Sequence, residues 1–195
     1  MSPRYDGPDR TPAPTRQAME TGMRTMILIG GLCSAALLAA PARAEPPQAG
    51  DYHYTLPLSL ALEAATEAVR VCGLQGYRVT ATVVDMDGIP QVALRGDGAT
   101  VHTAESSFEK AFTVITLGPE FNFDTSGAFF EMVKTNPYAP RLAQVRHVMA
   151  LPGAVAFHAK GSIVAALGVG GAPGGDKDEV CARAGIAKVA DRLPR

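Results

Sequence analysis

The sequence predicts an α+β fold, a single domain in which a central antiparallel β-sheet of two or more hairpins is covered by helices. Two observations predict it. Apolar residues recur with helical spacing in three long segments, and β-branched runs are joined in pairs across short turns. The resulting order is helix, hairpin, helix, irregular helical region, hairpin, helix, which is typical of one antiparallel sheet with helices packed against it.

The first helix is predicted to run from Leu58 to about Gly73, because apolar residues recur there every three or four positions. Thr55 or Ser59 would cap its start with a side-chain oxygen. We expect this helix to bury one face.

The first hairpin follows directly. Residues 78–84 alternate and are rich in β-branched side chains, and an Asp-Gly turn at Asp87 and Gly88 separates them from a second run, 89–94. Pro90 has no amide hydrogen, so the second strand is expected at an edge of the sheet or to begin at Pro90.

A second long helix is predicted over residues 101–116, capped by Thr100 or Thr103. Its helically spaced apolar positions, expected to face the core, are Ala104, Phe108, Ala111, Phe112 and Ile115. The face expected to point away from the core carries Ser106, Glu109, Lys110 and Thr113.

The remaining elements are shorter. Residues 126–134 form a predicted helix that ends before Asn136 and Pro137. Two strands, near 153–159 and 162–171, pair across the turn at Lys160 and Gly161. A glycine-rich loop then leads into a last helix that Asp176 or Asp178 would cap.

The N-terminal segment has the parts of a secretory signal. Arg24 precedes an apolar region at about residues 26–40, and an A-x-A-like sequence ends at Ala44. We expect residues 1–44 to be an N-terminal extension with a cleaved signal peptide, 45–56 a flexible linker and 57–195 the folded domain. A membrane anchor is the alternative, but the apolar region falls short of the roughly 20 residues needed to span a bilayer. The protein is therefore expected to be periplasmic or secreted.

The charge balance argues against a nucleic-acid-binding protein. The 18 Lys and Arg residues are balanced by 19 Asp and Glu, for a net charge of -1, which argues against a nucleic-acid partner.

The cysteines depend on the predicted export. Cys33 would leave with the signal, so Cys72 and Cys181 would remain in an oxidising compartment. They could form a disulfide or be two buried small apolar residues, and the sequence leaves both alternatives open.

Motifs for metal and hydrolytic sites are weak. The four histidines are scattered, and no H-x-x-x-H, C-x-x-C or G-x-S-x-G pattern occurs. Glu105 and Glu109 lie one helical turn apart and could share a cation, although a solvated face is the ordinary alternative. The glycine-rich segment 168–175 lacks the G-K-[ST] ending of a phosphate loop, so we interpret it as a backbone turn.

Three segments in the same order resemble the GlcG/HbpS family of haem-binding proteins. They are VVDMDGIPQVALRGDGA from Val83, EKAFT from Glu109 and GVGGAPGGDKDEVCARAG from Gly168. The resemblance implies an α/β fold with a central antiparallel sheet, homo-oligomers built from dimers up to octamers, and a bound haem or other tetrapyrrole. It also implies haem degradation in some members and, for secreted members, service to a membrane sensor kinase.

The resemblance further implies a set of ligand-binding residues. Lys110 and Thr113 match its motif, with Arg95 and Lys110 as partners for haem propionates and Thr113 as a hydroxyl near the iron. His102 is an alternative axial ligand suggested by this sequence alone. The family's iron-associated E-x-x-E spacing is not kept, because Glu105 and Glu109 are one residue further apart, and Gly170 stands where a serine is common.

From these observations we expect an exported haem-binding protein that sequesters haem or senses redox state or iron, with haem degradation as a secondary activity. The alternative is a periplasmic small-metabolite enzyme or enzyme-accessory protein that reuses the same pocket without haem, since a shared fold does not determine function.

Overall fold

The computed structural model describes residues 54–195. The predicted extension and signal segment, residues 1–44, lie outside this range, as does most of the predicted linker. No helix in residues 54–195 is long and apolar enough to cross a membrane.

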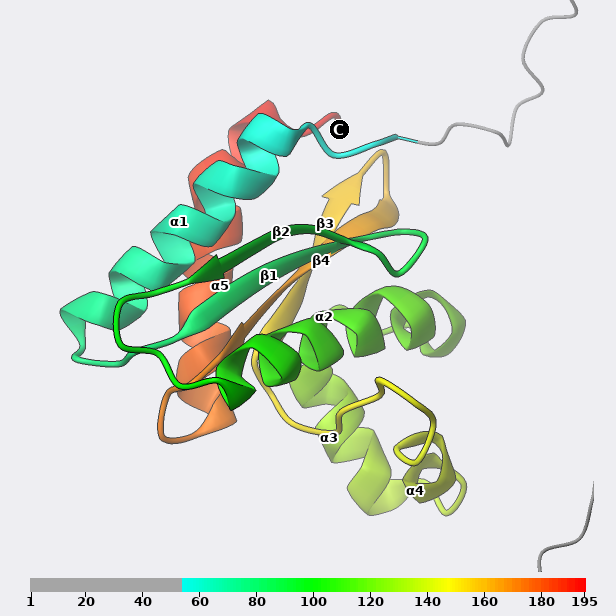
Figure 1. Cartoon of the computed structure of the whole chain (residues 1–195). Coiled ribbons are helices and arrows are strands. Elements are labelled where there is room, and N and C mark those ends of the chain that lie inside the picture. The colour runs from blue at the N-terminus through cyan, green and yellow to red at the C-terminus, as the bar shows by residue number, and fades with distance from the viewer. Residues whose placement is uncertain (1–53) are drawn as a thin grey trace, which may run out of the picture. The chain divides into compact units, whose positions relative to one another are not determined.

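The described chain forms one four-stranded antiparallel sheet in the order β2-β1-β4-β3 (Figure 1). The strands are β1 (Thr80–Asp85), β2 (Pro90–Arg95), β3 (Ala154–Ala159) and β4 (Ser162–Gly170). The helices are α1 (Leu58–Leu74), α2 (His102–Phe121), α3 (Ser126–Thr135), α4 (Ala139–Leu142) and α5 (Gly175–Val189), with a final turn at Ala190–Arg192.

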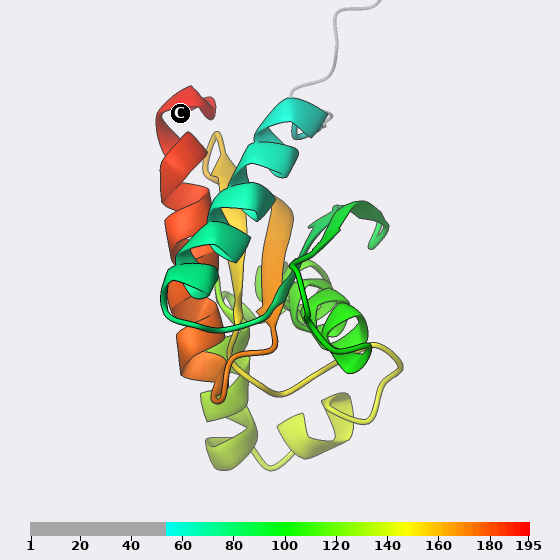
Figure 2. The same ribbon diagram turned by 60° about the vertical axis from the view of Figure 1, so that its left-hand side comes forward.

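Helices cover both faces of the sheet. Figure 2 shows α1 and α5 side by side on one face and α2 on the other, and the contacts between these elements agree. The predicted α+β architecture is therefore confirmed. Pro90 is the first residue of β2, and β2 lies at an edge of the sheet, as the missing amide hydrogen of proline requires.

The layer of α1 and α5 holds the larger core. Cys72 in α1 and Cys181 in α5 are both fully buried and joined by a disulfide, with 5.6 Å between their Cα atoms. The disulfide settles the alternative that the sequence left open. It ties the first helix of the described chain to the last, across 109 residues of sequence.

Helix boundaries differ from the sequence predictions in four places. Neither Thr100 nor Thr103 caps α2, whose N-cap residue is Val101 and which has no side-chain cap. Helix α2 continues to Phe121, past the predicted end at residue 116, and Asn122 ends it in a left-handed conformation. Neither Thr55 nor Ser59 caps α1, which has no side-chain cap and begins after Pro57. Helix α5 begins after Gly174, so Asp178 lies within its first turn instead of capping it.

The buried face of α2 also differs from the prediction. Ala104 is exposed, whereas the hydroxyls of Thr103 and Ser107 are buried. Each of these hydroxyls lies 2.7 Å from a threonine hydroxyl of β1, at Thr80 and Thr82 respectively. A buried polar side chain is tolerated where it has a hydrogen-bond partner, so the helix turns this polar stripe toward the sheet.

Two glycines of β4 allow α2 to approach this closely. A Cβ atom at Gly168 would lie 2.9 Å from the backbone nitrogen of Ala111, and one at Gly170 would lie 3.0 Å from that of Ser107. The strand therefore presents bare backbone to the helix. This contact determines which face of α2 is buried and which faces the solvent.

Candidate functional site

A cleft of about 720 Å³ opens beside the first half of α2. This volume lies within the usual range of small-molecule pockets. Its walls come from α2, from the segment before β3 and from the loop that leads into α5. The lining residues are His102, Glu105, Ser106, Glu109, Lys110, Met149, Leu151, Gly171, Ala172, Gly174, Gly175 and Asp178.

One face of α2 supplies four of these side chains. His102, Glu105, Ser106 and Glu109 follow at helical spacing and therefore project to the same side. The Nδ1 atom of His102 lies 3.2 Å from the hydroxyl of Thr100. This contact orients the imidazole at the start of the helix.

A buried ion pair lies at the cleft. Nζ of Lys110 donates to Oδ2 of Asp178 at 2.7 Å and to the carbonyl of Val169 at 3.1 Å. Oδ1 of Asp178 accepts the backbone N–H of Ala172 at 2.9 Å. Burial raises the pKa of Asp178 above its usual value of 3.8, although the attraction of Lys110 and these hydrogen bonds oppose the shift. The pair fastens the glycine-rich loop and α5 to α2.

Thr113 lies beneath the cleft and does not line it. Its side chain is fully buried; Oγ1 donates to the carbonyl of Glu109 at 2.8 Å and accepts the N–H of Met149 at 2.8 Å. We expected Lys110 and Thr113 to point away from the core, and this expectation is wrong for both. Because α2 is rotated toward its polar stripe, these two side chains turn inward.

Arg95 does not line the cleft either. It ends the edge strand β2, and its Nε donates to the carbonyl of Ala99 at 2.8 Å. The structure thus brings together four of the six predicted site residues, namely His102, Glu105, Glu109 and Lys110.

The two carboxylates predicted to share a cation both line the cleft. Glu109 is also 3.9 Å from Nδ1 of His147. Within residues 54–195 no group of three or more His, Cys, Asp or Glu side chains is arranged to hold a metal ion. A cation shared by Glu105 and Glu109 stays a prediction.

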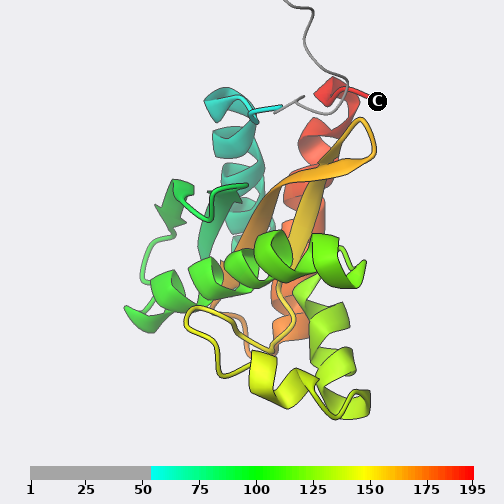
Figure 3. The ribbon, with the colours of Figure 1, turned by 90° about the vertical axis from the view of Figure 1, so that its right-hand side faces the viewer.

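The sequence predictions named neither Met149, Leu151 nor Asp178 as a site residue, although all three line the cleft. Met149 lies in the segment between α4 and β3, which runs along α2 (Figure 3), and no motif pointed to it. Asp178 was expected only as a helix cap. The signal that could have found Asp178 is the third segment of the family resemblance, which contains it.

Comparison with known proteins decides the family. The model of the family described as "Haem degrading protein HbpS-like" matches residues 56–187, which is more than half of the chain. The chain belongs to the HbpS-like family. This confirms the resemblance that the sequence motifs indicated.

Solved structures agree with this HbpS-like assignment. An HbpS variant of Streptomyces reticuli with two Glu-to-Asp substitutions is 36% identical, with a TM-score of 0.64 over 76% of this chain and 96% of that chain. Another HbpS structure is 37% identical, with a TM-score of 0.62 over 69% and 89% of the two chains. PduOC in complex with heme is 20% identical, with a TM-score of 0.60 over 69% and 95%, and shows the shared fold alone. Among curated proteins, no sequence matches this chain.

Proposed function

We propose that this HbpS-like protein is exported and binds haem or a related tetrapyrrole in the cleft beside α2. Binding would serve sequestration or the sensing of redox state or iron, with haem degradation as a secondary activity. The observation that carries the proposal is that an imidazole, at His102, and a thioether, at Met149, line the same cleft. These are the side-chain types that hold haem iron in many proteins.

The shape and lining of the cleft suit a flat, largely apolar ligand. Met149 and Leu151 supply apolar surface, and Gly171, Gly174 and Gly175 leave backbone without side chains on the facing wall. A planar ring can approach such a wall closely, because no Cβ atoms project from it. Haem, when bound, would supply the iron for any redox chemistry.

Lys110 retains one means of binding a propionate. An ammonium group has three donors, and two of them are engaged by Asp178 and by the carbonyl of Val169. In this proposal the third would donate to a ligand carboxylate that reaches the buried end of the Lys110 side chain, which is only 4% exposed. Arg95 and Thr113 do not line the cleft, so the proposal gives neither a direct contact with the ligand there.

Titration with hemin tests this proposal. The purified protein should give a saturable Soret shift that weakens or changes shape in His102→Ala. His158→Ala is the matched control, because His158 pairs with Asp124 on another surface and does not line the cleft. If hemin binds no better than it does to an unrelated acidic protein, or if both variants behave alike, the proposal is wrong.

A second candidate function rests on the charged groups of the same cleft. Glu105, Glu109 and the pair of Lys110 and Asp178 form a set of acids and bases suited to a small polar metabolite. The protein would then be a periplasmic enzyme or enzyme-accessory protein without haem. A colourless preparation whose native mass spectrum carries a small non-porphyrin ligand would favour this function over haem binding.

Export is supported by the disulfide between Cys72 and Cys181, because such bonds persist in oxidising compartments. Export would leave the protein periplasmic or secreted, cleaved after Ala44. N-terminal sequencing of the protein recovered from the periplasm or medium should begin at Glu45. An intact N-terminus in that fraction would contradict cleavage.

Assembly is the remaining part of the proposal. We expect a homo-oligomer built from dimers, up to an octamer, that presents its surface to a membrane sensor. Light scattering should give a multiple of the mass of one chain, and a single-chain mass would contradict the oligomer. Retention of a membrane kinase by the immobilised protein from detergent-solubilised membranes would support the sensor partner.

A further inference from the structure

Thr113 and Met149 are joined by a hydrogen bond although 36 residues separate them in sequence. We infer that Met149 supplies its thioether to the iron of the bound tetrapyrrole, and that Thr113 is the residue that positions Met149. This inference rests on the proposed haem-binding function and gives Met149 and Thr113 separate roles in it. The role given to Thr113 differs from the expectation that its hydroxyl contacts the ligand directly.

The hydroxyl of Thr113 cannot reach a ligand in the cleft. Its side chain is fully buried, its hydrogen is donated to the carbonyl of Glu109, and its oxygen accepts the N–H of Met149 at 2.8 Å. Both contacts fasten protein to protein. Thr113 therefore acts on the segment that crosses α2, and through that segment on the cleft.

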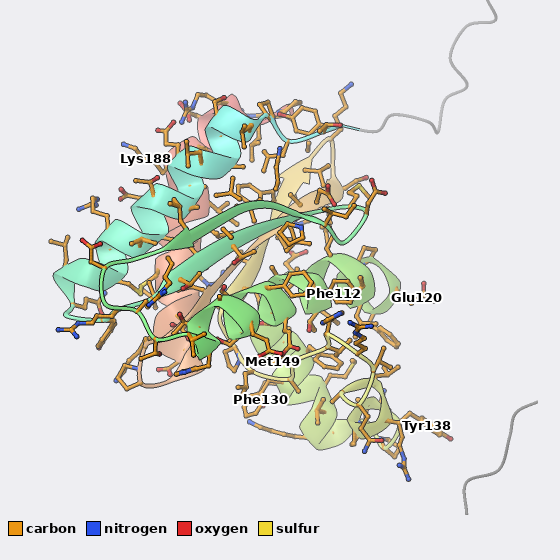
Figure 4. All side chains as sticks on the ribbon, viewed as in Figure 1. Phe112, Glu120, Phe130, Tyr138, Met149 and Lys188 are labelled. Atoms are coloured by element: carbon orange, nitrogen blue, oxygen red, sulfur yellow. A yellow bond between two sulfur atoms is a disulfide. The ribbon has the colours of Figure 1, made fainter. Side chains whose placement is uncertain are left out.

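Met149 is the residue that this bond presents to the cleft. Its backbone is tied to α2 by Thr113, and the preceding side chain, Val148, is buried beside Phe123 and Phe129. The Met149 side chain is half-buried and lines the cleft next to α2 (Figure 4). A methionine side chain has three rotatable bonds, so fixing its backbone narrows the positions that its sulfur can occupy.

The thioether differs chemically from the other groups that line the cleft. Sulfur is a soft, neutral donor, and methionine beside histidine at haem iron raises the reduction potential relative to harder ligands. His102 lines the same cleft, at the start of α2. Glu105 and Glu109 are hard anionic donors that favour the oxidised metal.

Substitutions of similar shape separate the ligand role of Met149 from the positioning role of Thr113. Met149→Leu keeps the apolar volume and removes the sulfur. Thr113→Val keeps the shape of threonine and leaves the N–H of Met149 without its acceptor, whereas Thr113→Ser retains the hydroxyl. The readouts are the reduction potential of bound hemin and the affinities for hemin and for metal-free protoporphyrin IX, which has no iron for the sulfur to bind.

The inference predicts that Met149→Leu lowers the reduction potential and weakens hemin binding, while protoporphyrin affinity stays within about twofold of wild type. Thr113→Val should shift the potential in the same direction and weaken hemin binding by about tenfold, as loss of a supporting contact typically does at a metal site. Thr113→Ser should restore the potential toward wild type. The double variant Met149→Leu/Thr113→Val should match Met149→Leu in potential, because Thr113 acts only through Met149.

The outcomes distinguish this inference from the proposed function. If wild type binds hemin and protoporphyrin but Met149→Leu leaves the potential unchanged, Met149 is not a ligand and the inference alone is overturned. If Thr113→Val shifts the potential in a Met149→Leu background, Thr113 acts by another route, and its positioning role is overturned. If wild type binds neither compound, the haem-binding proposal and this inference fall together. Circular dichroism of each variant confirms that the fold is retained.

Discussion

Nζ of Lys110 lies 2.7 Å from Oδ2 of Asp178, 68 residues away in sequence, and both side chains are almost completely buried. This pair joins the middle of α2 to the first turn of α5. It also holds the loop that forms one wall of the cleft, since Asp178 accepts the N–H of Ala172. This charged contact therefore links the wall opposite α2 to α2 itself.

Breaking this pair should be costly. Lys110→Met removes the ammonium and leaves a buried carboxylate without its countercharge, which typically destabilises a protein by about 3–5 kcal/mol. Urea unfolding measures the loss. The double variant Lys110→Met/Asp178→Asn has no buried charge and keeps an acceptor for Ala172, so it should be more stable than the single variant. Equal stability of wild type and Lys110→Met would show that the pair contributes nothing.

The stability of the protein should depend on pH through Asp178. Burial raises the pKa of this carboxyl above 3.8, so the folded state holds the proton at pH values where the unfolded chain has released it. The stability that this proton contributes is complete below pH 3.8 and is lost as pH rises through the higher pKa of the folded state.

Asp178→Asn does not titrate and provides the reference. The unfolding free energy of wild type minus that of Asp178→Asn should therefore fall as pH rises above 3.8 and then become constant. Unfolding titrations at a series of pH values measure it. A difference that increases with pH would mean that the attraction of Lys110 outweighs the cost of burial.

Packing of α2 on β4 should tolerate no side chain at Gly168. A Cβ atom there would lie 2.9 Å from the nitrogen and 3.0 Å from the Cβ of Ala111, so Gly168→Ala should cost about 1–3 kcal/mol through overpacking. Gly73→Ala is the matched control. No atom lies within 4 Å of its Cβ position in α1, so the variant should gain up to about 1 kcal/mol from helix propensity. Thermal unfolding of both variants measures the two effects. An unchanged midpoint for Gly168→Ala would contradict the close packing of α2 on β4.

The disulfide should contribute a large part of the stability. It closes 109 residues of chain, and loops of this length are associated with about 4 kcal/mol of stabilisation. The variant Cys72→Ala/Cys181→Ala should lose this amount in guanidinium unfolding. Reductant should lower the midpoint of wild type and leave that of the variant unchanged. A variant as stable as oxidised wild type would contradict this expectation.

Much of the fold could be predicted because its patterns are local. The helical spacing after Leu58 predicts α1, and alternation on both sides of the Asp-Gly turn at Asp87 and Gly88 predicts the first hairpin. Pro90 placed β2 at the edge by its missing amide hydrogen. Each of these inferences needs only neighbouring residues.

The orientation of α2 could not be predicted in this way. Its buried stripe includes Thr103 and Ser107, whose partners Thr80 and Thr82 lie more than 20 residues earlier in the chain. Helical spacing of apolar residues predicts the wrong buried face for α2, because its hydroxyl side chains are buried against hydroxyls of β1 with which they form hydrogen bonds. The same rotation turned Lys110 and Thr113 inward.

The site was partly predictable for the same reason. His102, Glu105 and Glu109 share one helix face, so their common location follows from local spacing. Met149 and Asp178 join them only through tertiary contacts with Thr113 and Lys110. Hydrogen bonds between distant segments, which no local period encodes, complete the cleft.

The most direct test of haem binding in this cleft is a crystal structure of the purified protein with hemin, with the iron located by its anomalous scattering. We expect one iron in the cleft beside α2, with the porphyrin against Met149 and the imidazole of His102. Iron at another surface, or a saturated complex in which neither residue contacts the porphyrin, would contradict it.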